Sequence, residues 1–464
     1  MALVDSSQVA ALRGAIRGQA CVPGDEGFAD ACNIWNGSIT RRPAVVARCL
    51  GSDDVAAALL FAQEHDLEVS VRGGGHGFAG FALCDGGLTI DLSLLKSVSV
   101  DPQAGRVTCG GGVTWAELDA ATQEHGLAVP GGQISHTGIG GLTLGGGFGW
   151  LTRKAGLTCD NLLGAEVVLA DGRVVRASVE ENADLYWAIR GGGGNFGVVT
   201  SFEFRLAEVG PMVNVGLFFF GLDQGAAMLR FVRDHLDELS EEVGLFIGGL
   251  NAPPAPFVPE HFQLQPCYAL GMVGFGDETD HAEVVAPIYQ LPHLFELVTP
   301  MPYVAVQQMF DESAPWGILA YEKAVYLDDL SDAAIDVITE YVPKRTSPMS
   351  FMPCFGLGGA YGRVAEDAAG FGGRRTIRFV VNIAAIAPTE ELLETDTAWV
   401  RSFWSALVPH SQGIGGYVNF MSEDDGDRVR AAYGEDKYRR LAAIKAAYDP
   451  KNIFHLNANI KPNG

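Results

Sequence analysis

The sequence predicts a two-domain α+β protein, in which a glycine-rich first domain precedes a second domain built on a sheet with helices on one face. Three observations lead to this prediction. Glycines are concentrated in one early part of the chain, with 21 of the 59 glycines between Arg72 and Gly149. Short β-branched runs alternate with helical patterns over residues 44–200, and longer apolar runs begin near Met212. A chain of 464 residues is also too long for one ordinary core.

Local signals define several elements of the first domain. Ser52-Asp53-Asp54 is typical of a helix cap and predicts a helix over residues 55–65. The spacing Thr114-x-x-Glu117 is that of a capping box and predicts another helix. Asp171-Gly172, between two apolar runs, predicts a β-hairpin with a type I′ turn. Residues 184–190 predict a short helix that ends at a run of four glycines.

The second domain is predicted over residues 212–410, where long apolar runs are separated by helical patterns. Aromatic, asparagine and glycine motifs return afterwards, so residues 411–464 are expected to rejoin the first domain, which covers residues 1–211. Alternate residues of a strand face opposite sides, so at most half of the aromatic side chains here can line a pocket. The predicted strands are 213–222, 245–250, 349–355 and 378–385, the predicted helices are 224–239 and 331–342, and the aromatic candidates are Phe218, Phe219, Phe220, Tyr326, Phe351, Phe355 and Tyr361.

Charge and composition exclude several classes of function. A formal net charge of −24 would repel nucleic acid and anionic membrane surfaces, so neither is an expected partner. No apolar run is long enough to span a bilayer, and the N-terminus lacks the pattern of a secretory signal, so we expect a cytoplasmic protein. The eight cysteines form no CxxC pair, which favours reduced thiols and predicts no metal site. A homo-oligomer is compatible with the sequence.

The segment 72–80, Arg-Gly-Gly-Gly-His-Gly-Phe-Ala-Gly, is the most informative feature of the chain. It follows a strand-like run at residues 67–71. Its five glycines let the backbone approach a large anionic ligand and present N–H groups to it. The glycines are consecutive and interrupted by a histidine, which differs from both the Rossmann and the Walker patterns. The loop predicts a dinucleotide cofactor with His76 held close to it.

Two further glycine segments repeat the pattern, at residues 131–149 and 191–200. Alternating glycine and small residues allow the backbone to run along a flat ring or a pyrophosphate. Each segment alone is a weak signal, because a structural turn explains it as well. Three of them in order, at 55 to 60 residue spacing, favour a cofactor cradle.

Together these segments resemble the FAD-linked oxidases of the vanillyl-alcohol oxidase superfamily, in particular the berberine-bridge-enzyme-like branch. The resemblance covers nearly the whole chain, and the stretch 135–138 is most similar to bacterial members. It implies an FAD-binding (PCMH-type) domain followed by a substrate domain with a large antiparallel sheet covered by helices. The motifs that carry it are Arg72-Gly-Gly-Gly-His76, Gly145-Gly-Gly-Phe-Gly149, Arg153-Lys154-x-Gly156-Leu-Thr-x-Asp160-Asn161, residues 187–202 and residues 448–460.

The resemblance also implies how FAD is held. The loop histidine of the family carries the flavin covalently, and His76 matches it. Many relatives add a second link from a cysteine, but that position is Ile134 here, so a single link is expected. The residues implied to bind FAD are Arg72, Gly73, Gly74, Gly75, His76, Gly77, Gly80, Gly138, Gly140, Gly141, Gly145, Gly146, Gly147, Gly194, Asn195, Gly197, Val199, Asn457 and Asn459.

Tyr417, Asn419 and Thr137 are the implied catalytic residues. Tyr417 and Asn419 belong to a motif that lies over the flavin in relatives, and Tyr417 is the expected base, although it also suits a ring that only packs on the cofactor. Thr137 matches the position beside the oxygen-reacting edge of the flavin. The expected reaction removes hydride from a C–H next to an alcohol or amine of a small or medium molecule, and dioxygen becomes hydrogen peroxide. An oxygenating enzyme that uses a flavin N5-oxide and a non-catalytic flavin-binding protein are the alternatives.

Overall fold

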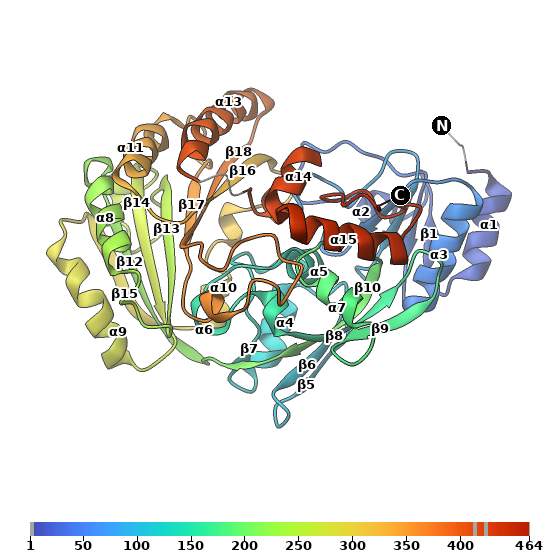
Figure 1. Ribbon diagram of the computed structural model, residues 1–464. Helices are drawn as coiled ribbons and strands as arrows, with labels where there is room; N and C mark the ends of the chain where they lie inside the picture. Colours follow the sequence, from blue (N-terminus) through green and yellow to red (C-terminus); the bar gives the residue numbers. More distant parts are fainter. Residues whose placement is uncertain (1–3, 412–414, 422–425, 464) are drawn as a thin grey trace.

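The computed structural model describes residues 4–411, 415–421 and 426–463. Figure 1 shows two lobes side by side, with the first part of the chain in one and the large sheet of the middle part in the other. The C-terminal helix α15 (Glu435–Tyr448) lies over the first lobe, where its Leu441, Ala442 and Ile444 pack into the core of the five-stranded sheet. This arrangement places the last described residues next to the glycine-rich segments.

The first lobe contains two sheets that pack through separate cores. In the four-stranded sheet β4 pairs in parallel with both β2 and β3, and the loop 72–80 leaves the carboxyl end of β3. In the five-stranded sheet every pairing is antiparallel. The strands, in sheet order, are β1 (Gln19–Cys21), β2 (Val45–Arg48), β4 (Leu88–Asp91) and β3 (Val69–Arg72), and then β5 (Val98–Asp101), β6 (Arg106–Gly110), β10 (Val198–Arg205), β8 (Leu162–Val168) and β9 (Val174–Ser178); β7 (Leu127–Ala128) pairs separately with β11 (Ala207–Glu208).

The second lobe is built on one seven-stranded antiparallel sheet. Alternate side chains on one face, such as Phe218 and Phe220, pack with three helices into a single core. The opposite face points toward the first lobe. This confirms the predicted α+β class and the predicted large sheet with helices on one face. The strands in sheet order are β15 (Phe295–Pro302), β12 (Met212–Phe220), β14 (Pro266–Gly274), β13 (Val243–Asn251), β17 (Met352–Gly356), β18 (Phe379–Ala387) and β16 (Leu319–Leu327).

Helices cover the outer surfaces of both lobes (Figure 1). The outer face of the seven-stranded sheet carries α8 (Gly225–His235), α11 (Asp332–Tyr341) and α13 (Glu390–Leu407), whose apolar faces enter the core named above. The other helices are α1 (Ser6–Ala15), α2 (Phe28–Ala31), α3 (Ser52–Glu64), α4 (Trp115–Gln123), α5 (Ile139–Gly145), α6 (Thr152–Ala155), α7 (Ala183–Ile189), α9 (Glu278–Val285), α10 (Tyr303–Gln307), α12 (Ala360–Arg363) and α14 (Gly426–Tyr433).

Two local predictions are wrong in detail. Helix α3 begins at Ser52 with Gly51 as its N-cap and has no side-chain cap, because the Asp54 carboxylate instead accepts hydrogen bonds from the backbone of Arg17, Gly18 and Leu50. The hairpin between β8 and β9 is present, but a type I′ turn needs positive φ at both central residues. Only Gly172 has it, at +83°, so its turn is of another type.

The predicted helix is present as α4 with Thr114 as its N-cap, and the Glu117 carboxylate reaches back to accept from the Thr114 backbone N–H at 2.8 Å and from its hydroxyl at 2.9 Å. The short helix before the glycine run is present as α7. None of the helices in the described ranges is long and apolar enough to cross a membrane.

Candidate active site

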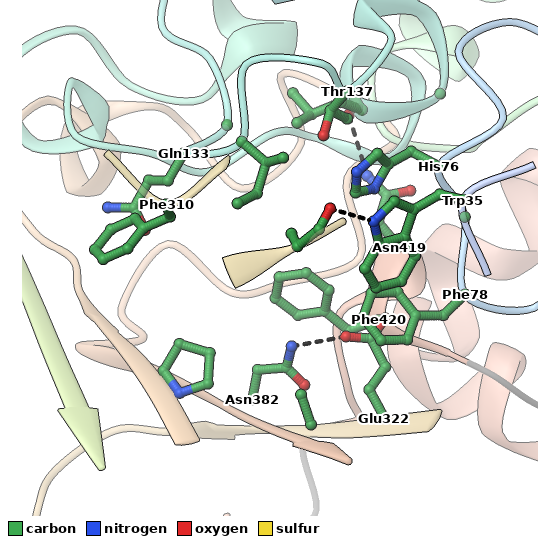
Figure 2. Close-up of a pocket in the computed structure, with 18 of the residues that line it drawn as sticks. Trp35, His76, Phe78, Gln133, Thr137, Phe310, Glu322, Asn382, Asn419 and Phe420 are labelled. Atoms are coloured by element: carbon green, nitrogen blue, oxygen red, sulfur yellow. Dashed lines mark hydrogen bonds between the residues drawn. The ribbon is translucent and has the colours of Figure 1, made fainter. Parts of the chain in front are cut away.

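A cavity of about 1090 Å³ lies between the two lobes and is lined by residues from both. The three glycine segments form its first-lobe wall, and the inner face of the seven-stranded sheet forms the opposite wall. Figure 2 shows His76 and Trp35 on one side of this space, with Glu322 and Asn382 below them on the sheet. A cavity of this size and position is the default candidate for a ligand site.

The first two glycine segments touch each other directly. A Cβ atom on Gly138 would lie 2.6 Å from the Gly74 Cα, which no ordinary side chain tolerates. Glycine at both positions therefore lets the loop 72–80 pass against the start of α5. The segment 139–145 is helical rather than extended, with Gly138 as its N-cap, and the Ile139 backbone N–H donates to the Val113 carbonyl at 2.9 Å.

Other glycines in these segments leave room instead of making contact. A Cβ atom on Gly141 or Gly194 would meet no atom within 4 Å, and both residues line the cavity. The same is true of Gly77. The fold does not need glycine at these three positions for packing. The open space above them fits a flat or extended group that runs along the backbone.

The His76 imidazole is stacked on Trp35, with ring centroids 4.7 Å apart and planes inclined by 16°. His136 lies on its other side at 4.9 Å, and Trp316 meets its edge. Burial, and then the nearby His136, lower the pKa of His76 to about 3. Its Nε2 is shielded from solvent and has no hydrogen-bond partner among the described residues. The imidazole is therefore neutral at ordinary pH and retains the free lone pair that bonding to carbon requires.

A segment of the second lobe holds this histidine pocket closed. The Trp35 indole donates to the Ala314 carbonyl at 2.8 Å. The Asp311 carboxylate accepts from the Ser135 backbone N–H at 2.8 Å and from the Ser135 hydroxyl at 2.6 Å. These bonds tie the segment around Ser135 to the second-lobe turn that carries Asp311.

Tyr417 is buried at the junction of the lobes, and its hydroxyl oxygen accepts two hydrogen bonds. The donors are the Gly147 backbone N–H at 2.7 Å and the Asn419 Nδ2 at 2.8 Å. Burial raises the pKa of Tyr417 well above its usual value, although these two donors act in the opposite direction. With both lone pairs engaged, the neutral phenol is arranged to donate its own proton rather than to accept another.

Glu322 on β16 and Asn382 on β18 face the cavity together, and sequence reasoning missed both. The Asn382 Nδ2 donates to the Glu322 Oε2 at 2.7 Å (Figure 2). Glu322 is fully buried, and burial raises the pKa of its carboxyl well above the usual range. Strand β16 was not among the predicted strands. The signal available for Glu322 was a glutamate within a strand-like apolar run. Burying a carboxyl costs free energy unless the carboxyl has hydrogen-bond partners or a functional role.

The predicted cofactor residues divide between the cavity wall and its support. Arg72 is turned away, toward Asp91 and the Asn33 carbonyl, and Asn195 ties the third segment to the C-terminal tail. Asn459 also lies outside the lining. The predicted residues that line the cavity are Gly73, Gly74, Gly75, His76, Gly77, Gly80, Thr137, Gly138, Gly140, Gly141, Gly194, Gly197, Val199, Tyr417, Asn419 and Asn457.

Gly145, Gly146 and Gly147 do not line the cavity; they allow other groups to pack closely. A Cβ atom on Gly145 would overlap the Asn419 side chain, and one on Gly146 would lie 2.8 Å from the Phe371 ring. Both Gly146 and Gly147 have positive φ, at +131° and +89°. These glycines let Asn419 and Tyr417 lie against the end of α5.

Ile134 lines the cavity at the position where relatives are expected to carry a second linking cysteine. All eight cysteines of the chain are buried and free, and none of them lines the cavity. Among the aromatic candidates, Phe219, Phe351 and Phe355 reach the cavity, whereas Phe218, Phe220, Tyr326 and Tyr361 do not. The alternation expected for a strand holds across Phe218-Phe219-Phe220.

These features define the class of the protein. Residues 43–178 match the model of an FAD binding domain, and residues 416–461 match the model described as berberine and berberine like. The glycine cradle with its open space, together with the shielded neutral imidazole, fits the cofactor that this domain binds. The protein is an FAD-linked oxidoreductase, as the sequence predicted.

Individual relatives place it within that class. The chain is 32% identical to (R)-6-hydroxynicotine oxidase of Paenarthrobacter nicotinovorans, over 97% of this chain and 98% of that protein. It is 29% identical to an FAD-linked oxidoreductase of Dictyostelium discoideum, over 92% and 91% of the two chains. The crystal structure of 6-hydroxy-D-nicotine oxidase from Arthrobacter nicotinovorans superposes with a TM-score of 0.85 at 30% identity, covering 97% and 98%. The chain belongs to the berberine-like family of FAD-linked oxidoreductases.

Proposed function

We propose that this protein is an FAD-dependent oxidase that removes hydride from a C–H next to an alcohol or amine of a small or medium organic molecule. The substrate loses two electrons and two protons in all, so an alcohol becomes a carbonyl compound and an amine becomes an imine. Bound FAD would accept the hydride and pass the two electrons to dioxygen, which becomes hydrogen peroxide. Relatives named as oxidases favour this reaction over the oxygenating alternative.

The observation that supports this function best is the position of the Glu322–Asn382 pair. It lies on the sheet wall of the cavity, opposite the glycine cradle, so a substrate between the two has an acceptor on one side and the cofactor on the other. Glu322 accepts the substrate O–H or N–H proton, and the Asn382 amide holds the carboxyl in position. Burial raises the pKa of the Glu322 carboxyl, which makes its carboxylate a stronger proton acceptor once it is ionised.

Tyr417, the base expected from the sequence, is the second candidate. Its oxygen can accept a proton only after it has released its own, which burial disfavours. We assign it the role of a hydrogen-bond donor to the bound cofactor or substrate, oriented by Gly147 and Asn419. Thr137 lines the cavity close to His76 and is proposed to border the path of dioxygen.

We further propose that His76 carries the flavin through a single covalent bond. The neutral, stacked imidazole supplies the nucleophilic nitrogen, and Trp35 and His136 fix its plane. The absence of a cysteine from the described cavity wall leaves no partner for a second bond.

The function is tested by anaerobic mixing of the purified yellow protein with a panel of cyclic amines, aromatic alcohols and benzylic amines. At least one member is expected to bleach the flavin absorption, and admission of air is expected to restore the colour with one equivalent of hydrogen peroxide. A protein that no member of the panel bleaches, or that is reoxidised without releasing peroxide, contradicts the proposal.

A further inference from the structure

The cavity extends beyond the part that borders His76 and crosses the inner face of the seven-stranded sheet. Glu322 lies on β16, which is one edge strand, and Leu297 lies on β15, which is the other; both line the cavity. Six interstrand steps of about 4.8 Å separate them, so the lined face is about 29 Å wide. A small molecule at Glu322 would leave most of this face uncovered.

The half of the cavity that lies over β12, β14 and β15 is apolar, and we call it the apolar arm. Its lining residues from these strands are Leu217, Phe219, Ala269, Gly271, Leu297 and Met301. The lining residues of each strand are an even number of positions apart, so one face of the sheet supplies them. Side chains that bind sugar hydroxyls are missing from all three strands within the described lining.

The neighbouring strand β13 and the second-lobe loop that carries Phe310 complete the apolar arm with aromatic walls. Phe246 and Phe310 lie with ring centroids 5.2 Å apart, and Phe310 stacks on Trp150. The polar lining residue of β13, Asn251, is already engaged, because its carboxamide oxygen accepts from Arg345 at 2.7 Å. These mutual contacts make a preformed wall rather than a set of adaptable polar groups.

Polar groups are concentrated at the opposite end of the sheet, around Glu322 and Asn382. The Asn382 side chain is 4% exposed, and its Oδ1 has no hydrogen-bond partner in the described part of the chain. An unpartnered buried carbonyl oxygen is costly, so a donor from a ligand would stabilise it. One hydrogen-bond donor on the substrate satisfies this end of the cavity.

We propose that the natural substrate has one amine or hydroxyl head, bound at Glu322 and Asn382, and an extended apolar body that lies along the apolar arm. This inference rests on the proposed function and names the substrate class for the same site. A free or oligomeric sugar fits the arm poorly, because β12, β14 and β15 offer its hydroxyls no hydrogen-bond partner and a hydroxyl buried without one is costly. A glucooligosaccharide oxidase of Acremonium strictum shares the fold with a TM-score of 0.88 at 23% identity, but a shared fold does not set the substrate.

The test is a calorimetric titration of the oxidised holoprotein, under anaerobic conditions, with 4-alkylphenols whose chains grow from methyl to heptyl. The phenol supplies the donor and the chain probes the arm. The dissociation constant is expected to fall about fourfold for each added methylene until the arm is filled. Cellobiose is expected to give no heat of binding at the same concentrations. Binding that is independent of chain length, or that is as tight for cellobiose, overturns the proposal.

A matched pair of variants locates the binding site of the chain. Leu297 and Val298 are neighbours on β15, but Leu297 lines the cavity whereas Val298 is 42% exposed and does not. Leu297→Trp is expected to weaken heptylphenol binding by tenfold or more and to leave methylphenol binding unchanged. Val298→Trp is expected to change neither. Equal effects of the two variants would place the alkyl chain elsewhere and contradict the proposal.

A second arm variant keeps the test decisive if Leu297→Trp does not fold. Ala269→Phe fills the arm from β14, and the same selective loss for the longer phenols is expected.

Failure of the substrate inference is distinguishable from failure of the proposed function. If phenol binding depends on chain length but no amine or alcohol bleaches the flavin, the proposed oxidase function is refuted. If an amine or alcohol bleaches the flavin but phenol binding does not depend on chain length, the apolar arm is refuted as the substrate site.

Discussion

The two walls of the cavity are built from different parts of the protein chain. The first-lobe wall is largely backbone, made by glycines such as Gly74, Gly138 and Gly141 that either touch each other or leave space open. The second-lobe wall is made of side chains on alternate positions of a sheet, including Glu322 and Asn382. A wall made of backbone requires particular residue types, here glycine, at its positions. A wall made of side chains on a sheet keeps the same backbone geometry while the side chains differ in chemistry. The cofactor half therefore depends on glycine at particular positions, and the substrate half on the side chains at alternate positions of the sheet.

The largest expected effect comes from the substrate wall. Glu322→Gln keeps the shape and the bond to Asn382 but removes the proton acceptor, so flavin reduction in single-turnover stopped flow is expected to slow by about 10²–10⁴-fold. In the wild type the reduction rate is expected to rise with pH, because burial raises the pKa of Glu322 and only the ionised carboxylate accepts a proton. The variant is expected to lose this rise.

The matched control is Glu312→Gln, which changes an exposed glutamate of the same cavity. It is expected to leave the rate and its pH dependence unchanged. Unaltered reduction by the Glu322→Gln protein would remove Glu322 from the mechanism.

The next effect is at the junction of the two lobes, where Asp119 of α4 accepts from Gln307 of α10 at 3.1 Å. Burial raises the pKa of Asp119 to about 7, and Tyr303 is the other titratable group that it faces. The unfolded carboxyl ionises near pH 3.9, so the folded state gains stability below that pH and loses it as pH rises to about 7. Relative to Asp119→Asn, the wild-type free energy of unfolding is expected to fall by on the order of 2–4 kcal/mol over this window in urea titrations.

The exposed Asp336→Asn serves as the control for that measurement, and parallel behaviour with the wild type is expected. If the Asp119→Asn and wild-type proteins keep a constant difference in stability from pH 4 to pH 8, this carboxyl does not titrate as described.

The cofactor wall is tested by adding a single methyl group. Gly74→Ala forces its new Cβ into the Gly138 backbone, and overpacking of this kind costs about 1–3 kcal/mol. The free energy of unfolding and the flavin content per chain are both expected to fall. Gly14→Ala, whose Cβ would meet nothing within 4 Å in the exposed helix α1, is expected to be neutral or slightly stabilising. Full flavin content and unchanged stability in Gly74→Ala would contradict the close contact of the two loops.

The smallest effect is expected at Tyr417, which belongs to both walls. Tyr417→Phe removes one hydrogen-bonding hydroxyl while the ring stays packed on Phe148 at 4.5 Å, so flavin reduction should slow by about tenfold. Tyr448→Phe, which removes an exposed hydroxyl bonded to Asp184, is the control without effect on this rate. A loss in Tyr417→Phe larger than that in Glu322→Gln would make Tyr417 the base, as the sequence alone suggested.

The same contrast explains what could be predicted from the sequence. The fold class and the glycine segments were predictable, because close backbone approach and open space both require glycine over short local stretches. The N-cap of α4 at Thr114 was predictable for the same local reason. The cap of α3 was not, because Asp54 bonds to Arg17 and Gly18 in a distant segment.

The substrate wall escaped sequence reasoning for a physical reason. Glu322 and Asn382 are 60 positions apart and meet only because β16 pairs with β18. Trp35 reaches His76 from a segment without any pattern, held there by Ala314 of the other lobe. Constellations that depend on tertiary pairing leave no periodic or spaced signal in one sequence.

The most direct test of the central claim is mass spectrometry of the intact, denatured protein followed by peptide mapping. The account predicts a chain heavier by one FAD, with the flavin on the peptide that contains His76 and nowhere else, and a chain of unmodified mass for His76→Ala. A wild-type protein of unmodified mass, or flavin carried by a peptide without His76, would contradict it.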